Sequence, residues 1–403
     1  MVSRSYPFIL LLSLALMVLL GQKYLSDTDK IYGKNNDYGA KVNGNTALAG
    51  ELESGDTAVV EEEVLNVQKE GFCSKPESAH NYTVCENLPL LPVVCGEQAE
   101  KREYDENGGK YRVPNIVHLV RVGDMNFDAV MFLNLRSVAR IQQPEIIYIY
   151  YTTEKPTGIY IERAEREIPC LLWVKVEDPD SVDGIQLSVP QSRSDVIRFT
   201  KILERGGIYV ANDVILLKSL DPLRRYSFAA GREREDSISD GIMLVEPNSI
   251  FAHTFYQESY LEALRSYNPS QDDFKYAQDG LFAFYRQHMR DDVHVKNDYL
   301  SRPPSLEGFG ATVIGHWDLS QHYALNLQLS NTFTDRPEPG WVQTAMEEEL
   351  RTMDNVYGEA ARIAYFGSPD LVFKPGEIAH DRMSTIKLNP LPNIEPDILE
   401  HEI

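Results

Sequence analysis

The sequence predicts an α/β protein with a single, mostly parallel sheet that is flanked by helices. From Val113 onwards, apolar runs of strand length alternate with segments in which apolar residues recur at helical spacing. This alternation is typical of parallel sheets whose faces are covered by helices. In addition, Gly206 and Gly207 separate a helical pattern from another apolar run, and glycine commonly ends helices.

The expected elements run strand, helix, strand, helix, strand and then continue in a mixed order. They are strand 113–122, helix 127–141, strand 145–152, helix 157–167, strand 171–178, a helix from Ser192, strand 208–217, strand 241–247, helix 249–267 and one or two helices within 341–368. Ser192 and Asp195 have the spacing of a capping box, which predicts that their helix begins at Ser192. Its apolar face comprises Val196, Phe199, Ile202 and Leu203.

The expected strand at 208–217 is interrupted in its middle. Ala211, Asn212 and Asp213 separate two apolar runs that both look like buried strand. A residue that follows a strand of a parallel sheet lies at the carboxyl edge, where such sheets bind ligands. Asp213 is therefore a candidate binding residue, and the alternative is that it only caps a turn between two strands.

Residues 1–23 are expected to form a cytoplasmic tip and a signal-anchor helix. Residues 5–22 carry no charge, and as a helix they would span roughly 27 Å, enough for a thin membrane of the early secretory pathway. Arg4 favours a cytoplasmic N-terminus. A cleaved signal peptide is the alternative, and both interpretations place the rest of the chain in the lumen or outside the cell.

Three further regions are expected after the anchor. Residues 24–105 are polar and weakly periodic, which predicts a lumenal stem. The main domain is expected at 106–375, and a loosely packed, proline-containing tail at 376–403.

The cysteines favour an oxidising compartment. Cys73, Cys85 and Cys95 cluster in the expected stem, and Cys170 lies in the main domain. Their spacing fits no common zinc site, so disulfides are the expected use, with three complete pairings possible. Asn81 begins the sequence Asn-Tyr-Thr, an acceptor site for N-glycosylation.

The charge of the chain excludes one class of partner. The formal net charge is −22, and so acidic a surface repels phosphate backbones. We therefore expect no nucleic-acid partner, whereas a nucleotide could still be held at a local cation site.

The stretch "SDVIRFTKILERGGIYVAND" resembles the glycosyltransferases that carry a DXD sugar-binding motif. The matching residues are Ser194, Asp195, Arg198, Gly206, Gly207, Ile208, Tyr209 and Asp213. Upstream, "VPNIVHLV" is similar to the first strand of that family, with His118 in its usual place. Downstream, "HYALNLQL" (322–329) looks like a late segment in which members keep a histidine. The resemblance covers about residues 113–370 and implies a GT-A-like fold, which is a single Rossmann-like sheet.

The resemblance also implies a reaction and a set of site residues. The activity would be transfer of a hexosyl or N-acetylhexosaminyl group, with retention, from a nucleotide-sugar donor to a glycan or glycolipid acceptor. Asp195 and Arg198 would contact the ribose and the donor sugar or phosphate. Asp213 would bind a divalent cation, Mn²⁺ or Mg²⁺, which neutralises the leaving diphosphate. Such enzymes are anchored in the Golgi membrane as single-pass type II proteins; no residue is assigned as catalytic.

The sequence departs from the family pattern at Ala211, which replaces the first Asp of the motif. A methyl group can hold neither an ion nor a hydrogen bond, so the metal site is expected to be weakened. Asn212 could supply a carbonyl instead, and the late histidine could be His322 or be replaced by Asn326. The alternative function is therefore a weak or inactive pseudo-glycosyltransferase that acts as a lumenal binding domain. An unrelated secreted α/β domain remains a third possibility if the motif match is chance.

Other site residues also have simpler interpretations. Asp195 could serve only in the capping box, and Arg198 could be a solvated helix residue. His118 is either a base or a structural histidine at a strand end. Asp240 is a weaker candidate, at a position where the family often shows a polar residue near the acceptor.

Overall fold

The structure is a computed structural model that describes residues 73–75, 81–123, 127–234, 237–266, 276–296, 300, 318–327 and 346–377. All of them lie within one compact unit, Gln68–Ile403. The expected anchor at 1–23, residues 24–72 of the expected stem and residues 378–403 of the expected tail lie outside the described residues. Among the described helices, none is long and apolar enough to cross a membrane.

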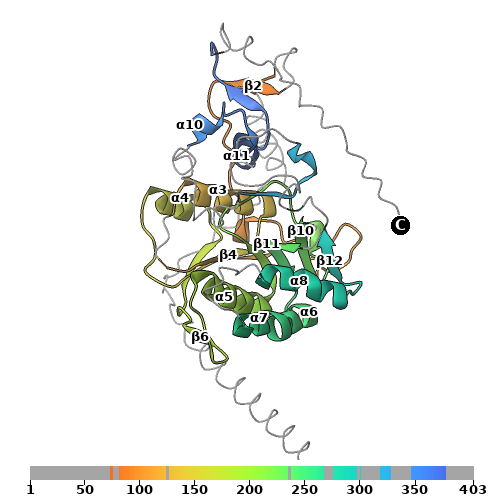
Figure 1. The fold of residues 1–403 in the computed structure, drawn as a ribbon. Helices are drawn as coiled ribbons and strands as arrows, with labels where there is room; N and C mark the ends of the chain where they lie inside the picture. Colours follow the sequence, from red (N-terminus) through yellow and green to blue (C-terminus); the bar gives the residue numbers. More distant parts are fainter. Residues whose placement is uncertain are drawn as a thin grey trace, which may run out of the picture. The chain divides into compact units, whose positions relative to one another are not determined.

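A seven-stranded sheet forms the centre of this unit (Figure 1). Its strands, in spatial order, are β12 (Val293–Lys296), β10 (Phe228–Arg234), β11 (Ser237–Val245), β8 (Gly207–Val210), β3 (Ile116–Arg121), β4 (Ile146–Tyr151) and β5 (Leu171–Lys175). Neighbouring strands are parallel except that β11 is antiparallel to both β8 and β10. The prediction of an α/β fold is confirmed, with a mixed sheet in which β11 runs against the other strands.

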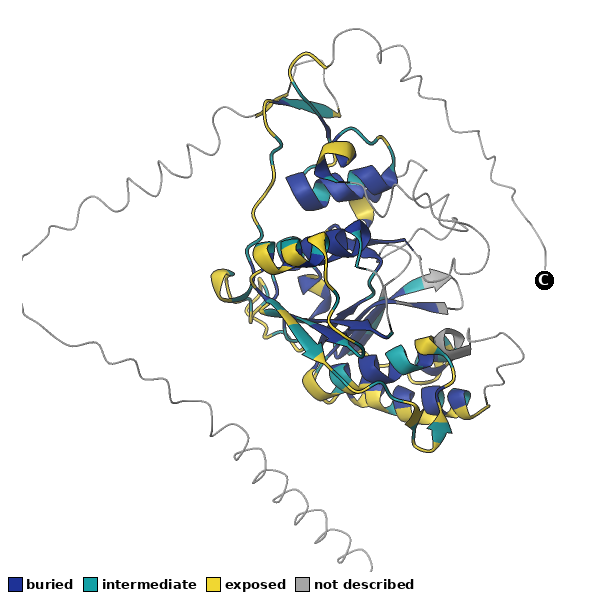
Figure 2. Ribbon diagram, turned by 90° about the vertical axis from the view of Figure 1, so that its left-hand side faces the viewer, coloured by how far each residue is buried: buried dark blue, intermediate teal, exposed yellow. Residues whose placement is uncertain are grey.

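Helices cover both faces of this sheet (Figure 1). On one side lie α3 (Ala129–Ser137), α4 (Ile159–Glu167), α10 (Glu347–Leu350) and α11 (Val356–Phe366). On the other lie α5 (Pro190–Arg205), α6 (Ile250–Thr254), α7 (Leu261–Ser266) and α8 (Tyr276–Gln287). Each layer packs on the sheet through its own buried apolar cluster. Figure 2 shows that the central strands are largely buried, while exposed residues lie on the helices and on the connecting loops.

Two of the expected helices contain π-helical turns. The helix expected at 127–141 consists of α3 and the π-helix η2 (Val138–Gln142). The helix expected at 249–267 consists of α6, the π-helix η4 (Phe255–Tyr260) and α7. Such turns shift the register of side chains along a helix and are frequent at functional sites.

The folded unit begins earlier than the boundary expected between residues 105 and 106. Strand β2 (Tyr82–Cys85) pairs with β1 (Cys73–Ser74) and, in parallel, with the C-terminal strand β14 (Leu371–Phe373). Disulfides join Cys73 to Cys85 and Cys95 to Cys170. Because the second disulfide reaches the residue before β5, the segment that carries Cys95 belongs to the folded unit rather than to a separate stem.

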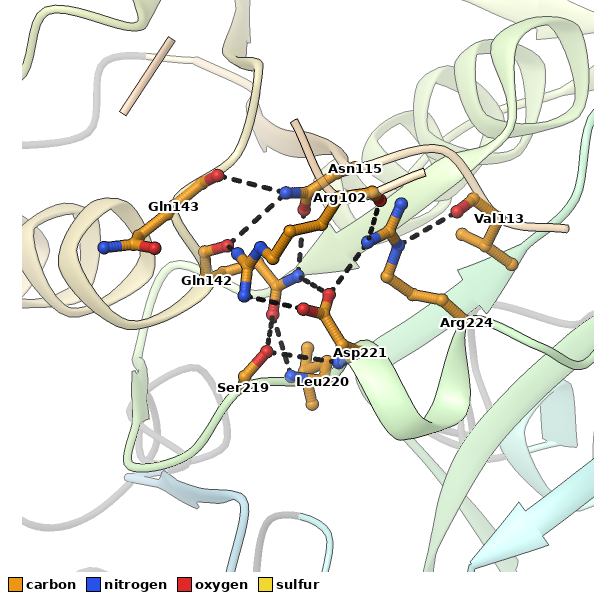
Figure 3. Close-up of polar contacts among 9 residues, drawn as sticks. All are labelled: Arg102, Val113, Asn115, Gln142, Gln143, Ser219, Leu220, Asp221 and Arg224. Atoms are coloured by element: carbon orange, nitrogen blue, oxygen red, sulfur yellow. Dashed lines mark hydrogen bonds and ion pairs between the residues drawn. The ribbon is translucent and has the colours of Figure 1, made fainter. Parts of the chain in front are cut away.

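A buried polar network fixes the amino end of β3 (Figure 3). The carboxylate of Asp221 accepts bonds from Arg102, from Arg224 (2.8 Å) and from the amide of Gln142 (2.9 Å). The same Gln142 amide donates to the side-chain oxygen of Asn115 (2.8 Å). This network connects Arg102, from the expected stem, to the amino edge of the sheet, which is opposite the edge that carries residues 211–213. The role of the network is therefore structural.

Candidate functional site

The interruption at 211–213 marks the point where the chain changes sheets. Strand β8 ends at Val210, and the backbone NH of Ala211 still donates to the carbonyl of Gly241 on β11 (2.8 Å). A turn follows, in which the NH of Val214 donates to the carbonyl of Ala211 (3.3 Å). Strand β9 (Val214–Leu216) then pairs with β13 (Ala324–Asn326) in a separate two-stranded sheet. Both apolar runs are therefore buried, and the polar residues between them form the crossing.

Side chains from α3 hold this crossing in place. The Asn134 amide donates to the carbonyls of Ala211 (3.0 Å) and Val214. One turn further on, the Ser137 hydroxyl accepts from the NH of Leu216 (2.9 Å). Sequence reasoning missed both residues, and the one available signal was a polar pair within an otherwise apolar helix.

Asp213 lies in the crossing and is buried. Its residue is 8% exposed, and its carbonyl accepts from the NH of Leu327 (3.0 Å). Asn326 pairs with the adjacent Val214 in the β9–β13 ladder and is also buried. The structure therefore brings Asp213 and Asn326 together at the end of β13.

The same geometry shows which residue of the segment 322–329, His322 or Asn326, lies beside the motif. His322 precedes β13, where Tyr323 accepts bonds from the NH groups of Leu217 and Lys218. Four residues of extended chain span about 13 Å, so His322 lies at the far end of the small sheet from Asp213. Asn326, and not His322, occupies the position beside the motif.

The donor atoms around the crossing suit a hard cation. Asp213 carries a carboxylate, and Asn212 and Asn326 carry amide oxygens. The Asn212 amide nitrogen donates to the carbonyl of Val120 (2.9 Å), while its oxygen is buried and has no hydrogen-bond partner among the described residues. In the described part of the chain, no group of three or more His, Cys, Asp or Glu side chains is placed to hold a metal ion. Mg²⁺ typically uses one or two carboxylates together with substrate phosphates, so the residues present fit such an ion.

Asp195 and Arg198 form a buried ion pair on the face of α5 that covers the sheet. Their exposed fractions are 3% and 5%, and Arg198 Nη2 lies 2.8 Å from Asp195 Oδ1. The guanidinium of Arg198 also stacks on the ring of Tyr209, 4.8 Å from its centroid. Tyr209 lies on β8, two residues before Ala211. The ion pair of Asp195 and Arg198 therefore lies next to the strand that leads into the crossing. Arg198 is therefore not a solvated helix residue.

The expected capping box at Ser192 is wrong. Helix α5 begins at Pro190, whose ring suits the first turn because proline has no NH to leave unsatisfied. The Ser192 hydroxyl donates to the carbonyl of Val189 (2.8 Å) instead of accepting from the helix. Asp195 therefore lies in the second turn and is held by Arg198 and by the hydroxyl of Tyr260 (3.0 Å).

His118 is structural, which excludes the interpretation as a base. Its Nε2 donates to the carbonyl of Gly206 (2.8 Å), and its Nδ1 accepts from the hydroxyl of Tyr150 (3.1 Å). Burial lowers the pKa of His118 to about 4, so the ring is neutral. A Cβ at Gly207, where φ is +121°, would lie 2.7 Å from His118 Nε2. The second glycine of the pair is thus required by this contact as well as by its backbone conformation.

Two further candidates are placed as follows. Asp240 lies on β11 directly before Gly241, at the sheet edge that carries the crossing, and its side chain lies outside the described residues. Asn81 is exposed, directly before β2. The candidate residues therefore form two clusters, Asp213 with Asn326 and Asp195 with Arg198, which β8 connects.

A family model matches the central part of the chain. Residues 133–229 match the family model described as the glycosyltransferase sugar-binding region containing a DXD motif. This range includes Asp195, Arg198 and Asp213, so the resemblance is confirmed for its central part, whereas the strand with His118 and the segment 322–329 lie outside the matched range. The class that the fold and the matched region define is a glycosyltransferase-like α/β protein.

Individual relatives are distant. The chain is 28% identical over 130 residues to Glucan organizing enzyme 1 of Cryptococcus neoformans var. grubii serotype A. The aligned segment covers 30% of this chain and 34% of the relative. It thus spans about a third of that relative's length. Among solved structures it is similar to the PaToxG glycosyltransferase, with 16% identity and a TM-score of 0.31 over 43% of this chain and 70% of that one. It is also similar to the galactosyltransferase LgtC in complex with donor and acceptor sugar analogs, with 15% identity and a TM-score of 0.32 over 46% of this chain and 75% of that one.

Proposed function

We propose that the protein transfers a hexosyl or N-acetylhexosaminyl group from a nucleotide-sugar donor to a glycan or glycolipid acceptor. The proposed location is the Golgi lumen, with residues 1–23 as a membrane anchor, and the proposed stereochemistry is retention. The observation that supports this function best is the crossing itself. One carboxylate, Asp213, lies where the chain leaves the sheet, and β8 connects it to the buried pair of Asp195 and Arg198.

Each cluster has a distinct task in this proposal. A divalent cation, when bound, would neutralise the charge that develops on the leaving diphosphate. Asp213 would hold this cation, with neutral amide oxygens available from Asn212, its neighbour in the chain, and from Asn326, which pairs with Val214. Asp195 and Arg198 would orient the ribose and the donor sugar through charge-assisted hydrogen bonds. Asn134 keeps the backbone of the crossing fixed, so that Asp213 does not have to be ordered when the donor binds.

The test compares Asp213→Asn with the wild type in donor binding and donor hydrolysis. The probes are UDP-glucose, UDP-galactose, UDP-N-acetylglucosamine and GDP-mannose, each with and without Mn²⁺. We expect Mn²⁺ to increase the affinity of the wild type for at least one donor, and this increase to disappear in Asp213→Asn, which keeps the shape of the side chain. Asp291→Asn is the matched control, because Asp291 is exposed in the turn before β12, at the opposite edge of the sheet. Equal Mn²⁺ dependence in all three proteins would show that Asp213 has only a structural role.

A pseudo-glycosyltransferase that binds glycans in the lumen is the second candidate function. Ala211 favours it, because the methyl group at this position cannot contact a donor sugar through a hydrogen bond. Under this alternative, the wild type would bind a donor or a glycan but would show no hydrolysis or transfer with any probe.

A further inference from the structure

Tyr260 is the last residue of the π-helix η4 and is buried against α5. Its hydroxyl donates to Asp195 Oδ2 at 3.0 Å, while Arg198 Nη2 lies 2.8 Å from Asp195 Oδ1. Each oxygen of the carboxylate therefore has a donor of its own. Two bonds from different elements fix the plane of the carboxylate as well as its position.

The surrounding rings fix the tyrosine in turn. The ring of Phe199 on α5 lies 5.3 Å from the ring of Tyr260 and 5.1 Å from that of Tyr256, measured between centroids. Burial raises the pKa of Tyr260 well above its usual value, and the charge of Asp195 raises it further. The hydroxyl consequently stays protonated and can only serve this carboxylate as a donor.

We propose that Tyr260 is a positioning residue for recognition of the donor sugar, acting through Asp195 and Arg198. This inference rests on the proposed function. Because Ala211 contributes no carboxylate, the ion pair on α5 has to provide more of the polar recognition of the sugar. Its orientation is set by Tyr260 on one side and by the stacking of Arg198 on Tyr209 on the other.

The structure offers a matched pair of variants to test this role. Tyr260→Phe removes only the hydroxyl that contacts Asp195. Tyr256→Phe is the control, because Tyr256 is buried on the same π-helix against the same ring of Phe199, but its hydroxyl bonds to Thr200. Asp195→Asn provides a background in which the charged acceptor is absent.

The measurement separates sugar recognition from nucleotide binding. Dissociation constants are determined by calorimetry, in Mn²⁺, for the four nucleotide sugars above and for UDP and GDP, which lack the sugar. For Tyr260→Phe we expect the dissociation constant of the donor to rise by about tenfold, the effect of losing one hydrogen bond to a charged group. UDP and GDP keep the ribose but lack the transferred sugar, so they should lose clearly less affinity than the nucleotide sugars. Tyr256→Phe should match the wild type for every probe. In the Asp195→Asn background, Tyr260→Phe should cause no further loss.

The other outcomes overturn the proposal in distinguishable ways. Unchanged donor binding in Tyr260→Phe, or an equal loss for nucleotide sugars and free nucleotides, would leave Tyr260 a structural residue while the proposed function stands. A full further loss in the Asp195→Asn background would show that Tyr260 does not act through Asp195. Failure of the wild type to bind any nucleotide sugar would overturn the proposed function together with this inference.

Discussion

Replacing Ala211 with aspartate restores the carboxylate that the DXD motif otherwise contains. The backbone at this position is already fixed, because the NH of Ala211 donates to Gly241 and its carbonyl accepts from Asn134. The side chain is half-buried and packs against both apolar clusters of the domain. Ala211→Asp should therefore change the chemistry of the crossing without changing the path of the chain.

The expected gain in donor affinity depends on the cation. One charge-assisted hydrogen bond contributes about 1.5–3 kcal/mol, which corresponds to about one to two decades in the donor dissociation constant. The new carboxylate would be two residues from Asp213, and two like charges so close repel each other until a cation neutralises them. The gain should thus occur only with Mn²⁺. Partial desolvation of the carboxylate should cost roughly 1 kcal/mol of stability, or about 2–4 °C in Tm.

Calorimetry with the four nucleotide sugars, with and without Mn²⁺, measures this dependence, and a hydrolysis assay measures turnover. Ala211→Asn is the control, because it adds a side chain of the same size without the charge and should show no cation-dependent gain. If the restored contact strengthens in the transition state, hydrolysis by Ala211→Asp should also accelerate. Folded Ala211→Asp that binds no better than the wild type in Mn²⁺, or equally better without it, would refute the reasoning.

Two further predictions concern the pH dependence of stability and the location of the protein in the cell. The pKa of His118 is about 4 in the folded protein, and 6.5 is the ordinary value that applies to the unfolded chain. Between these two values the unfolded chain takes up a proton that the folded protein does not. Stability therefore falls as the pH decreases from 6.5 towards 4. Between pH 7 and pH 5 urea unfolding should show a loss about 2 kcal/mol larger in the wild type than in His118→Gln, and equal losses would contradict the neutral buried ring. If residues 1–23 are an uncleaved anchor, a tag before Met1 should remain on a membrane-bound protein whose Asn81 glycan is sensitive to endoglycosidase; a secreted product without the tag would instead indicate a signal peptide.

Local pattern was sufficient to predict most of the sheet and its helices. The apolar runs at 113–122, 145–152 and 171–178 contain β3, β4 and β5, because buried parallel strands require continuous apolar sequence. The direction of β11 could not be predicted in the same way. Its sequence looks like any other buried strand, and only its pairing between β8 and β10 sets its orientation.

The residues that support the site could not be predicted, because their partners are distant in sequence. Asn134 acts on carbonyls 77 and 80 residues further on, and Tyr260 acts on a carboxylate 65 residues before it. The error at Ser192 has a different origin. The capping-box spacing is present, but Pro190 starts the helix two residues earlier and leaves Ser192 inside the first turn.

The contacts of the crossing also indicate how the loss of the first motif aspartate should be interpreted. The described hydrogen bonds that hold Ala211 involve its backbone. Those that hold the turn come from Asn134, Ser137, the Asn212 amide and the NH of Leu327. No described hydrogen bond of the fold depends on the side chain at position 211, so the cost of a change there is limited to its packing and desolvation. Asp195 differs, because its replacement would leave the buried guanidinium of Arg198 without the carboxylate that neutralises it, which is costly. The ion pair of Asp195 and Arg198 therefore contributes to stability as well as to the proposed site, whereas Asp213 and Ala211 bear mainly on the cation. Cation-dependent binding tests the site at these two positions, and donor hydrolysis separates an enzyme from a binding domain.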